Sequence, residues 1–437
     1  MRRSYKFLLR PTKKQEAALS ACLEDIRQLY NAALEERREA WRMGRRQVTF
    51  YSQSAQLKEI RADDSARYGR WSFDCERSAI RRLDRAFQGF YRRVKAGKKP
   101  GYPRFKGRGW WDSIEWPAVR GGACWDSAAH PNVARVYFKG IGHVRVHQHR
   151  PVKGQVKTIT VKREADRWYV VLSCNDVPTE PLEPTGALVG IDLGVTSFLT
   201  TSDGKHVPNP RYLAATSERL AASQRDLSLK KRGSNRRKKT VAKVARLHGK
   251  VRRQRLDHAH STALALVRAH DLIVHEDLKI ANLTRRPRPR PDGGGGYEPN
   301  GGAAKAGLNK SIHDAGWGIF LRILSAKAES AGRTVIAVDP RHSSQQCAQC
   351  GHIAVGNRVS QAEFRCLACG HQANADVNAA QNILRAGLAL QEAGMPPEKL
   401  LLSGAEESHT WKYTGRRRRT QVLIILIFKP LILGRNL

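Results

Sequence analysis

The stretch CAQCGHIAVGNRVSQAEFRCLACGHQANADVNAA, residues 347–380, carries two cysteine pairs that lead directly into an acidic helix start. Each Cys-x-x-Cys turn can present two thiolates to one ion, and the separation of the pairs is typical of a tetrahedral zinc site. Gly-His follows each pair, so we expect two facing knuckles whose glycines permit a tight backbone reversal. The predicted zinc ligands are Cys347, Cys350, Cys366 and Cys369. Two disulfides or four inert thiols are the alternative interpretation.

The net charge of the chain indicates a polyanionic partner. Among 437 residues, 78 are lysine or arginine and 39 are acidic, which gives a formal net charge of +39 at pH 7. Such a chain repels itself unless it binds a large polyanion, and nucleic acid is the obvious one. Nine tryptophans and eleven tyrosines add surfaces on which unpaired bases can stack. No membrane partner is expected, because the apolar run at 422–428 is too short to span a bilayer.

The remaining cysteines and the first residues of the chain indicate the cellular compartment. The four cysteines without metal or disulfide spacing are Cys22, Cys75, Cys124 and Cys174, and free thiols favour a reducing compartment. Arg2 and Arg3 are followed by Ser-Tyr-Lys-Phe-Leu-Leu-Arg and not by the apolar core of a signal peptide. We therefore expect a cytoplasmic protein.

The N-terminal part is predicted to combine helices with a small β-barrel. Apolar alternation predicts a strand at 5–9, and helical spacing predicts one helix that begins at Thr12 and another over about 74–94. Turn signals between short apolar runs predict five strands, at 98–106, 134–138, 144–147, 156–161 and 168–172. The proline and glutamate residues at 178–185 predict a linker.

Two basic segments are the predicted nucleic-acid contacts. Segment 98–106 sets basic and aromatic side chains around prolines, which suits a strand backbone and its bases. Region 225–255 has apolar residues at helical spacing, so one face can pack while the other meets phosphates. The candidate contacts are Lys99, Arg104, Phe105, Lys106, Lys238, Lys239, Lys243, Arg246 and Lys250. A solvated basic face is the alternative interpretation.

Three acidic residues follow buried elements. An apolar strand at 187–191 leads into Asp192, a second at 271–275 leads into Glu276, and Asp376 lies at a helix start, where the positive helix end favours a carboxylate. Two magnesium ions about 4 Å apart need several oxygen ligands on rigid elements, and these three acids fit that role.

Each acid also has a purely structural interpretation. Asp192 can be a turn former, Glu276 an exposed strand end and Asp376 an N-cap. Asp277 competes with Glu276, because adjacent side chains of a strand point to opposite faces and only one of them can face the metals.

Together these residues resemble the TnpB (OrfB) proteins of bacterial insertion sequences, which are related to type V CRISPR effectors. Besides the two cysteine pairs, the matching motifs include Gly190-Ile-Asp-Leu-Gly-Val195, Val274-His-Glu-Asp-Leu278, Asp314-Ala-Gly-Trp317, Ser343-Ser-Gln345 and Asn374-Ala-Asp-Val-Asn-Ala-Ala380. The resemblance is dense over 186–385. It implies an α/β RNase H-like (RuvC) nuclease domain with an inserted zinc knuckle, preceded by a wedge-like β-barrel that carries a helical insert. It also maps the family's catalytic acids onto Asp192, Glu276 and Asp376.

The resemblance further implies a domain order and partners. The boundaries are 1–177 for the wedge-like barrel, with a recognition insert at about 11–96, 178–185 for the linker, 186–342 and 373–392 for the nuclease, 343–372 for the zinc knuckle, and 393–437 for a non-globular tail. The implied partners are a guide RNA from the element's own end and a double-stranded DNA target, met in a bacterial nucleoid. Residues 285–302 correspond to a mobile lid, although a disordered insert fits their composition equally.

The expected function is therefore that of an RNA-guided DNA endonuclease of an insertion sequence, with a magnesium-dependent two-metal mechanism and a structural zinc ion. A strand-transfer transposase of RNase H-like fold is one alternative, and the zinc knuckle just before the third acid argues against it. A repressor that binds nucleic acid without cutting is the other, and the intact acids argue against that.

Overall fold

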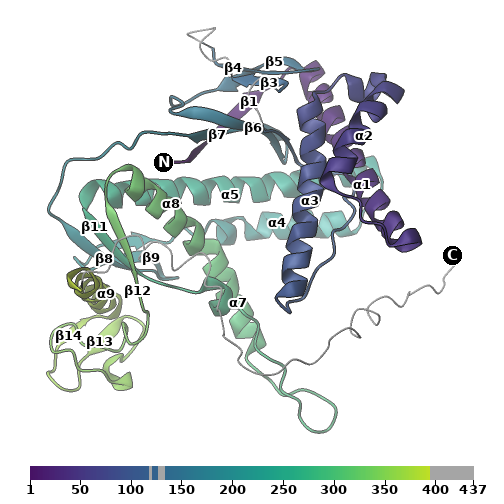
Figure 1. The fold of residues 1–437 in the computed structure, drawn as a ribbon. Coiled ribbons are helices and arrows are strands. Elements are labelled where there is room, and N and C mark those ends of the chain that lie inside the picture. The colour runs from purple at the N-terminus through teal and green to yellow at the C-terminus, as the bar shows by residue number, and fades with distance from the viewer. Residues whose placement is uncertain (118–120, 126–132, 394–437) are drawn as a thin grey trace, which may run out of the picture.

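The computed structural model describes residues 1–117, 121–125 and 133–393, so the predicted tail over 394–437 lies outside the described residues. Two sheets, each with its own hydrophobic core, organise the chain (Figure 1). The hydrophobic core of the first sheet is built from residues up to Val177. Two further clusters of buried apolar residues surround the second sheet, and both lie at or after Val189 in the sequence. No described helix is long and apolar enough to cross a membrane.

The first sheet has seven antiparallel strands in the order β2-β6-β7-β1-β5-β4-β3. The strands are β1 (Arg3–Arg10), β2 (Ser113–Trp116), β3 (Ala123–Trp125), β4 (Arg135–Phe138), β5 (Gly142–His147), β6 (Gln155–Glu164) and β7 (Arg167–Asn175). The predicted strands at 5–9, 134–138, 144–147, 156–161 and 168–172 are confirmed. In the described residues the hydrogen-bonded ladder ends at β2 and β3, so closure into a barrel stays a prediction.

The strand predicted at 98–106 is wrong, because that segment is a loop without regular structure. Pro100 and Pro103 have no N–H to donate to a ladder, and Gly101 adopts a φ of 62°, outside the strand region. The aromatic and basic side chains of this segment therefore project from a loop and not from a sheet edge.

Helices α1 (Lys13–Gly44), α2 (Phe50–Asp63) and α3 (Phe73–Lys95) form the helical insert, with a single π-helical turn, η1 (Ser65–Gly69), before α3. Thr12 begins α1 as predicted: its hydroxyl accepts from the Gln15 N–H at 3.3 Å, and the Gln15 side chain accepts from the Thr12 N–H at 3.0 Å. The apolar stripe of α1 then packs against the first sheet.

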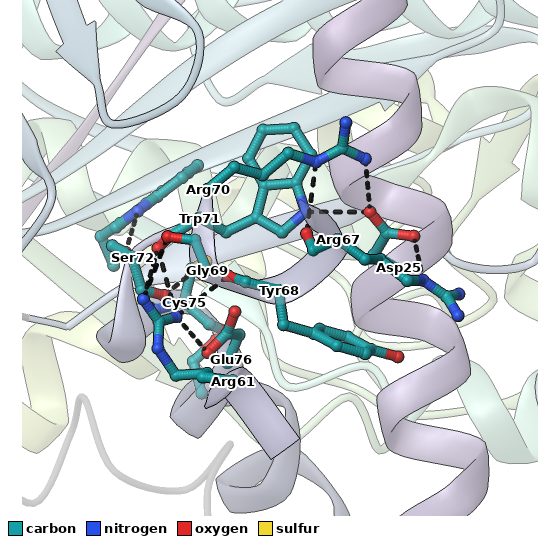
Figure 2. A network of polar contacts seen from close by, with 12 residues as sticks. Asp25, Arg61, Arg67, Tyr68, Gly69, Arg70, Trp71, Ser72, Cys75 and Glu76 are labelled. Carbon is teal, nitrogen blue, oxygen red and sulfur yellow. Dashed lines mark hydrogen bonds and ion pairs between the residues drawn. The ribbon is translucent and has the colours of Figure 1, made fainter. Parts of the chain in front are cut away.

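A buried polar network fixes the insert (Figure 2). Asp25 of α1 accepts hydrogen bonds from Arg67, Arg70 and the indole N–H of Trp71, each at 2.8 or 2.9 Å. Arg61 of α2 pairs with the buried Glu76 of α3 at 2.6 Å. Because these bonds cross between elements, they fix how the short η1 segment passes from α2 to α3.

The second sheet has five strands in the order β10-β9-β8-β11-β12. They are β8 (Leu188–Asp192), β9 (Ser197–Thr201), β10 (His206–Pro208), β11 (Leu272–Glu276) and β12 (Thr334–Val338). β8, β11 and β12 are parallel, while β9 and β10 pair antiparallel beside β8. The apolar runs predicted at 187–191 and 271–275 are thus buried parallel strands.

Helices cover both faces of this sheet. The helices of this part of the chain are α4 (Tyr212–Ser228), α5 (Asn235–Ala269), α6 (Ile280–Leu283), α7 (Gly302–Ala315), α8 (Trp317–Ser330) and α9 (Ala375–Glu392), of which α5, α8 and α9 contribute most to the cores on the two faces. Odd-numbered strand residues such as Ile191 and Ile273 pack with α5 and α8, whereas even-numbered ones such as Leu272 and Val274 pack with α9. The basic region at 225–255 is not one helix, because a turn at Gly233 (φ 85°) separates α4 from α5.

The predicted linker is tied to the second sheet. The Thr185 and Gly186 N–H groups donate to Asp271, and the buried Arg333 bonds both Asp271 and the Glu183 carbonyl. Upstream, the Glu180 N–H donates to the Ser330 carbonyl. The connection between the two sheets is therefore an anchored strap.

Candidate active site and zinc site

Asp192 and Glu276 lie side by side at the same edge of the second sheet. Each ends its strand, β8 and β11 are parallel neighbours, and the register pairs Ile191 with His275 one residue earlier. The even-numbered side chains of these strands face α9, and Asp192 and Glu276 are both even-numbered. Asp376 lies in the first turn of α9. The fold thus brings together the three predicted acids from distant segments.

The choice between Glu276 and Asp277 is decided by the strand. Glu276 is the last residue of β11, whereas the Asp277 N–H donates to the Val338 carbonyl and its carboxylate pairs with the exposed Lys279 at 2.5 Å. Adjacent side chains alternate between faces, so Asp277 is turned away from the other acids.

Two glycines allow α9 to lie close to the sheet. A Cβ at Gly190 of β8 would clash with the Ala380 carbonyl oxygen and the Leu384 nitrogen of α9. A Cβ at Gly387 of α9 would clash with Val274 of β11. The close approach at both points fixes where the N-terminal end of α9, and hence Asp376, lies relative to the strands.

The electrostatics of the three acids are coupled. Burial, together with the charges of Glu276 and Asp376, raises the pKa of Asp192 to about 7, while Arg358 opposes the shift. Burial also raises the pKa of Glu276. Crowded, desolvated carboxylates of this kind are stabilised by a bound cation.

Two further residues belong to this site that the sequence did not single out. The Ser343 hydroxyl donates to Glu276 Oε1 at 2.5 Å, and the Arg358 guanidinium contacts Asp376 Oδ1 at 3.2 Å. Ser343 lies within a motif of the resemblance, but its role needed the tertiary contact. Arg358 lies between the cysteine pairs, where a basic residue looks like surface charge.

The four cysteines form a compact cluster. Their Sγ atoms all lie within 4.8 Å of one another. Among the described residues, they are the group of potential metal ligands that is gathered this closely. The Cys347–Cys369 and Cys350–Cys366 sulfur distances are 3.7 and 3.6 Å, close to the ~3.8 Å edge of a tetrahedron with ~2.3 Å Zn–S bonds. A disulfide needs an S–S bond of about 2.05 Å, so the disulfide alternative is wrong.

The backbone around the cluster has the predicted two-knuckle plan. Cys347 N–H donates to the His352 carbonyl, and Cys366 N–H donates to the His371 carbonyl, at 2.9 Å each. Gly351 and Gly370 occupy the matching turns with φ of 78° and 74°. Between the knuckles lie η3 (Val355–Asn357) and β13 (Glu363–Arg365), and β13 pairs with β14 (Gln372–Asn374), which follows the second knuckle. The donor set and its spacing fit a structural zinc ion.

Hydrogen bonds from helix α9 connect the segment of the cysteine cluster with the three acids. The fully buried Asn378 accepts from the Ala348 N–H at 2.9 Å and donates to the Gln346 carbonyl at 2.7 Å. One turn later, Asn382 donates to the Ser343 carbonyl at 3.0 Å. The segment from Ser343 to the first knuckle is thus fixed to the helix that carries Asp376.

The predicted nucleic-acid contacts lie on two separate elements. Lys99, Arg104 and Phe105 are exposed on the loop before β2, and the Lys106 backbone is held by Asn31 of α1. The five predicted α5 residues, Lys238, Lys239, Lys243, Arg246 and Lys250, are all exposed. Figure 1 shows α4 and α5 running beneath the first sheet toward α1 and α3. Their contact with nucleic acid stays a prediction.

Comparison with known proteins agrees with this arrangement. Family models match over 158–286, described as a probable transposase, over 317–383, described as a Cas12f1-like TNB domain, and over 1–46, described as a helix-turn-helix domain. The chain is 34% identical, over 90% of its length and 94% of the relative, to the "Putative RNA-guided DNA endonuclease InsQ" of Escherichia coli (strain K12). It is also 34% identical to a "Putative RNA-guided DNA endonuclease" of Streptomyces pristinaespiralis, over 90% of this chain and 91% of the other.

A solved structure of the mini-RNA-guided endonuclease CRISPR-Cas_phi3 aligns over 89% of this chain and 92% of its own, at 12% identity and a TM-score of 0.45. At that TM-score the likeness adds nothing to the assignment. The sequence matches place the chain among proteins described as a probable transposase and as putative RNA-guided DNA endonucleases. The chain belongs to the TnpB (OrfB) family.

Proposed function

We propose that this protein is an RNA-guided DNA endonuclease of an insertion sequence, which hydrolyses DNA phosphodiesters with Asp192, Glu276 and Asp376. The observation that carries the proposal is the convergence of these acids at the β8 and β11 ends and the α9 start. It is supported by 34% identity over 90% of the chain to a relative that is named an RNA-guided DNA endonuclease.

The strand order supports an RNase H-like (RuvC) assignment for the second sheet. Three parallel strands flanked by an antiparallel hairpin, with helices on both faces, are the arrangement expected for that fold. We divide the chain accordingly into a wedge-like domain (1–177), a strap (178–185), a nuclease in two parts (186–342 and 373–392) and a zinc knuckle (343–372). The separate cores of the two sheets support the first boundary.

Asp192, Glu276 and Asp376 would hold two magnesium ions. The donor set fits, since it consists of hard oxygen ligands on rigid elements, and burial together with mutual repulsion favours a bound cation. The chemistry that such ions supply is activation of water and stabilisation of the leaving oxygen.

Ser343 and Arg358 would orient and neutralise the catalytic carboxylates. Ser343 fixes one Glu276 oxygen by its hydrogen bond, which leaves the other oxygen free to act. Arg358 places a positive charge beside Asp376, where a DNA phosphate would enter. The zinc ion would hold the knuckle and do no chemistry. The products would carry a 5′-phosphate and a 3′-hydroxyl.

The proposed partners are a guide RNA from the element's own end and a double-stranded DNA target, met in the bacterial nucleoid. The excess of basic residues supports a polyanionic partner. The exposed cations of α5 and the 98–106 loop are the surfaces we propose for it. Residues 285–302, which lead into the first residue of α7, are the proposed lid.

Purification of the protein expressed from its native locus, followed by sequencing of the bound RNA, tests whether the protein carries a guide RNA. A defined RNA from the element's end supports the proposal, and random cellular RNA contradicts it. The RNA-loaded protein is then given a matching plasmid with magnesium. Asp192→Ala, Glu276→Ala and Asp376→Ala should each abolish cleavage while target binding survives.

Asp277→Asn is the matched control, because that carboxylate faces away from the site and pairs with Lys279. It should cleave at close to the wild-type rate. Wild-type cleavage by any of the three alanine variants would remove that acid from the mechanism. Joined 3′ ends without RNA would point to strand transfer, and target binding without nicking to a repressor.

A further inference from the structure

A cavity of about 150 Å³ lies where α1, the loop before β2 and the end of β6 meet. Its volume is several times the roughly 30 Å³ that a water molecule occupies in the liquid. The polar side chains that line it are those of Ser20, Glu24, Arg27, Arg108, Trp111 and Arg163. It is far along the chain from the three acids and plays no part in the proposed hydrolysis.

Trp111 supplies a buried donor without an acceptor. Its side chain is 3% exposed, and within the described residues its Nε1–H has no hydrogen-bond partner. The ring is held in place by Tyr30, at a centroid distance of 5.0 Å, and by the Arg82 guanidinium, at 4.2 Å. The Trp111 ring is one wall of the cavity, so its indole signal can report on a ligand that enters there.

Two guanidinium groups of the cavity are also available. Arg108 is exposed, and Arg163 is half-buried with its guanidinium 5.7 Å from the Trp168 ring. Within the part of the chain that the structure describes, neither side chain has an ion pair or hydrogen bond. Arginine binds phosphate through two parallel N–H donors, so such groups suit an oxyanion.

The one acid of the cavity is already neutralised. Arg27 donates to both oxygens of Glu24, at 3.0 and 2.5 Å, and Gln28 donates to one of them at 3.0 Å. Arg27 accordingly lowers the pKa of Glu24 to about 2. The Arg108 charge also acts on Glu24, without a hydrogen bond, so the N–H donors of Arg108 and Arg163 remain available to a ligand.

The position of the cavity indicates which phosphate it takes. The loop that forms one wall also carries Lys99, Arg104 and Phe105, and Arg27 and Asn31 bind its Lys106 carbonyl at 2.7 and 3.0 Å. A strand that follows this exposed basic and aromatic loop therefore passes the mouth of the cavity. We propose that the cavity binds one backbone phosphate of a nucleic-acid strand through Arg108 and Arg163, beside the Trp111 ring.

This inference rests on the proposed function only in needing a nucleic-acid strand as partner. Its test therefore uses neither a guide nor cleavage. The full-length protein is labelled with ¹⁵N at its tryptophan indoles, and the Trp111 signal is assigned from Trp111→Phe. The probes are a short oligothymidylate, its uncharged methylphosphonate analogue and inorganic phosphate.

Oligothymidylate should move the Trp111 indole signal, and the methylphosphonate should not. Arg108→Gln and Arg163→Gln should each weaken oligothymidylate binding by about tenfold. Each should also reduce the slope of log K against log salt by about 0.7. Arg322→Gln is the matched control, since it removes one exposed charge from α8, outside the proposed nucleic-acid surfaces, and should change binding little.

An unmoved Trp111 signal under saturating oligothymidylate would overturn the proposal. So would a response to inorganic phosphate at lower concentration than to oligothymidylate, because the site would then take free phosphate. Arg108 is exposed and makes no internal bond, so its variant should remain folded and keeps the test decisive. Loss of DNA cleavage alone would leave these binding results standing and would instead count against the nuclease proposal.

Discussion

Ser343 Oγ donates a 2.5 Å hydrogen bond to Glu276 Oε1 across 67 residues of sequence. Ser343 is itself held by α9, because its carbonyl accepts from Asn382. The Glu276 carboxylate at the end of β11 is thus oriented by the segment that leads into the zinc knuckle. One hydrogen-bond path therefore connects the metal-binding insert with the candidate catalytic acids.

Ser343→Ala should slow DNA cleavage by about tenfold or more, because a hydrogen bond to a charged group contributes about 1.5–3 kcal/mol. The rate of plasmid linearisation by the RNA-loaded protein, measured across a magnesium titration, checks this. The variant should need more magnesium for half-maximal rate, since Glu276 is no longer pre-oriented. Ser344→Ala is the neighbouring control, and equal losses in both variants would argue against a specific role for Ser343.

Cys366→Ser should remove most of the bound zinc and lower cleavage by at least about tenfold, because α9 is bound to the knuckle through Asn378. Elemental analysis should find about one zinc per wild-type chain. Cys124→Ser provides the comparison, since that thiol lies outside the cluster. Full zinc content in Cys366→Ser would show that three thiolates suffice.

Gly190→Ala should destabilise the protein by about 1–3 kcal/mol and impair cleavage, because the new methyl group would clash with the backbone of α9. Thermal unfolding and plasmid cleavage measure the two effects. Gly307→Ala in α7 is the matched control, because nothing lies within 4 Å of the added carbon and alanine favours a helix. Wild-type stability in Gly190→Ala would mean that α9 can shift away from the sheet at little cost.

Glu76 should make the helical insert less stable as pH rises. Burial raises the pKa of Glu76 to about 7, although Arg61 and Lys139 oppose the shift and Asp25 adds to it. Between about pH 4.5 and 7 the folded state then binds this proton more tightly than the unfolded state, so the free energy of unfolding falls as pH rises through that window.

Glu76→Gln cannot ionise and should lack this contribution. The difference in melting temperature, wild type minus variant, should shrink between about pH 5 and about pH 7.5. The exposed Glu59→Gln serves as control and should track the wild type at both values. A constant difference for Glu76→Gln would contradict the buried, raised pKa.

The sequence by itself determined the local chemistry. Four cysteines at this spacing predict a site for one metal ion, because each turn presents two thiolates. The distances between the sulfur atoms agree with this prediction. The apolar runs before Asp192 and Glu276 predicted buried strands, since continuous apolar residues need cover on both faces. The Thr12 cap and the α1 stripe also followed from pattern alone.

Only the tertiary structure decided which groups meet. The order of β8 and β11, and the side of the sheet that α9 covers, depend on packing between segments far apart in sequence. That packing turned Glu276 rather than Asp277 toward Asp192, and brought Ser343 and Arg358 to the acids. It also showed that 98–106 is a loop and that 225–255 contains a turn, although the prolines and glycines that interrupt these segments are visible in the sequence. Spacing along the chain fixes which residues share a face, whereas contact between faces is fixed by the shape of the whole core.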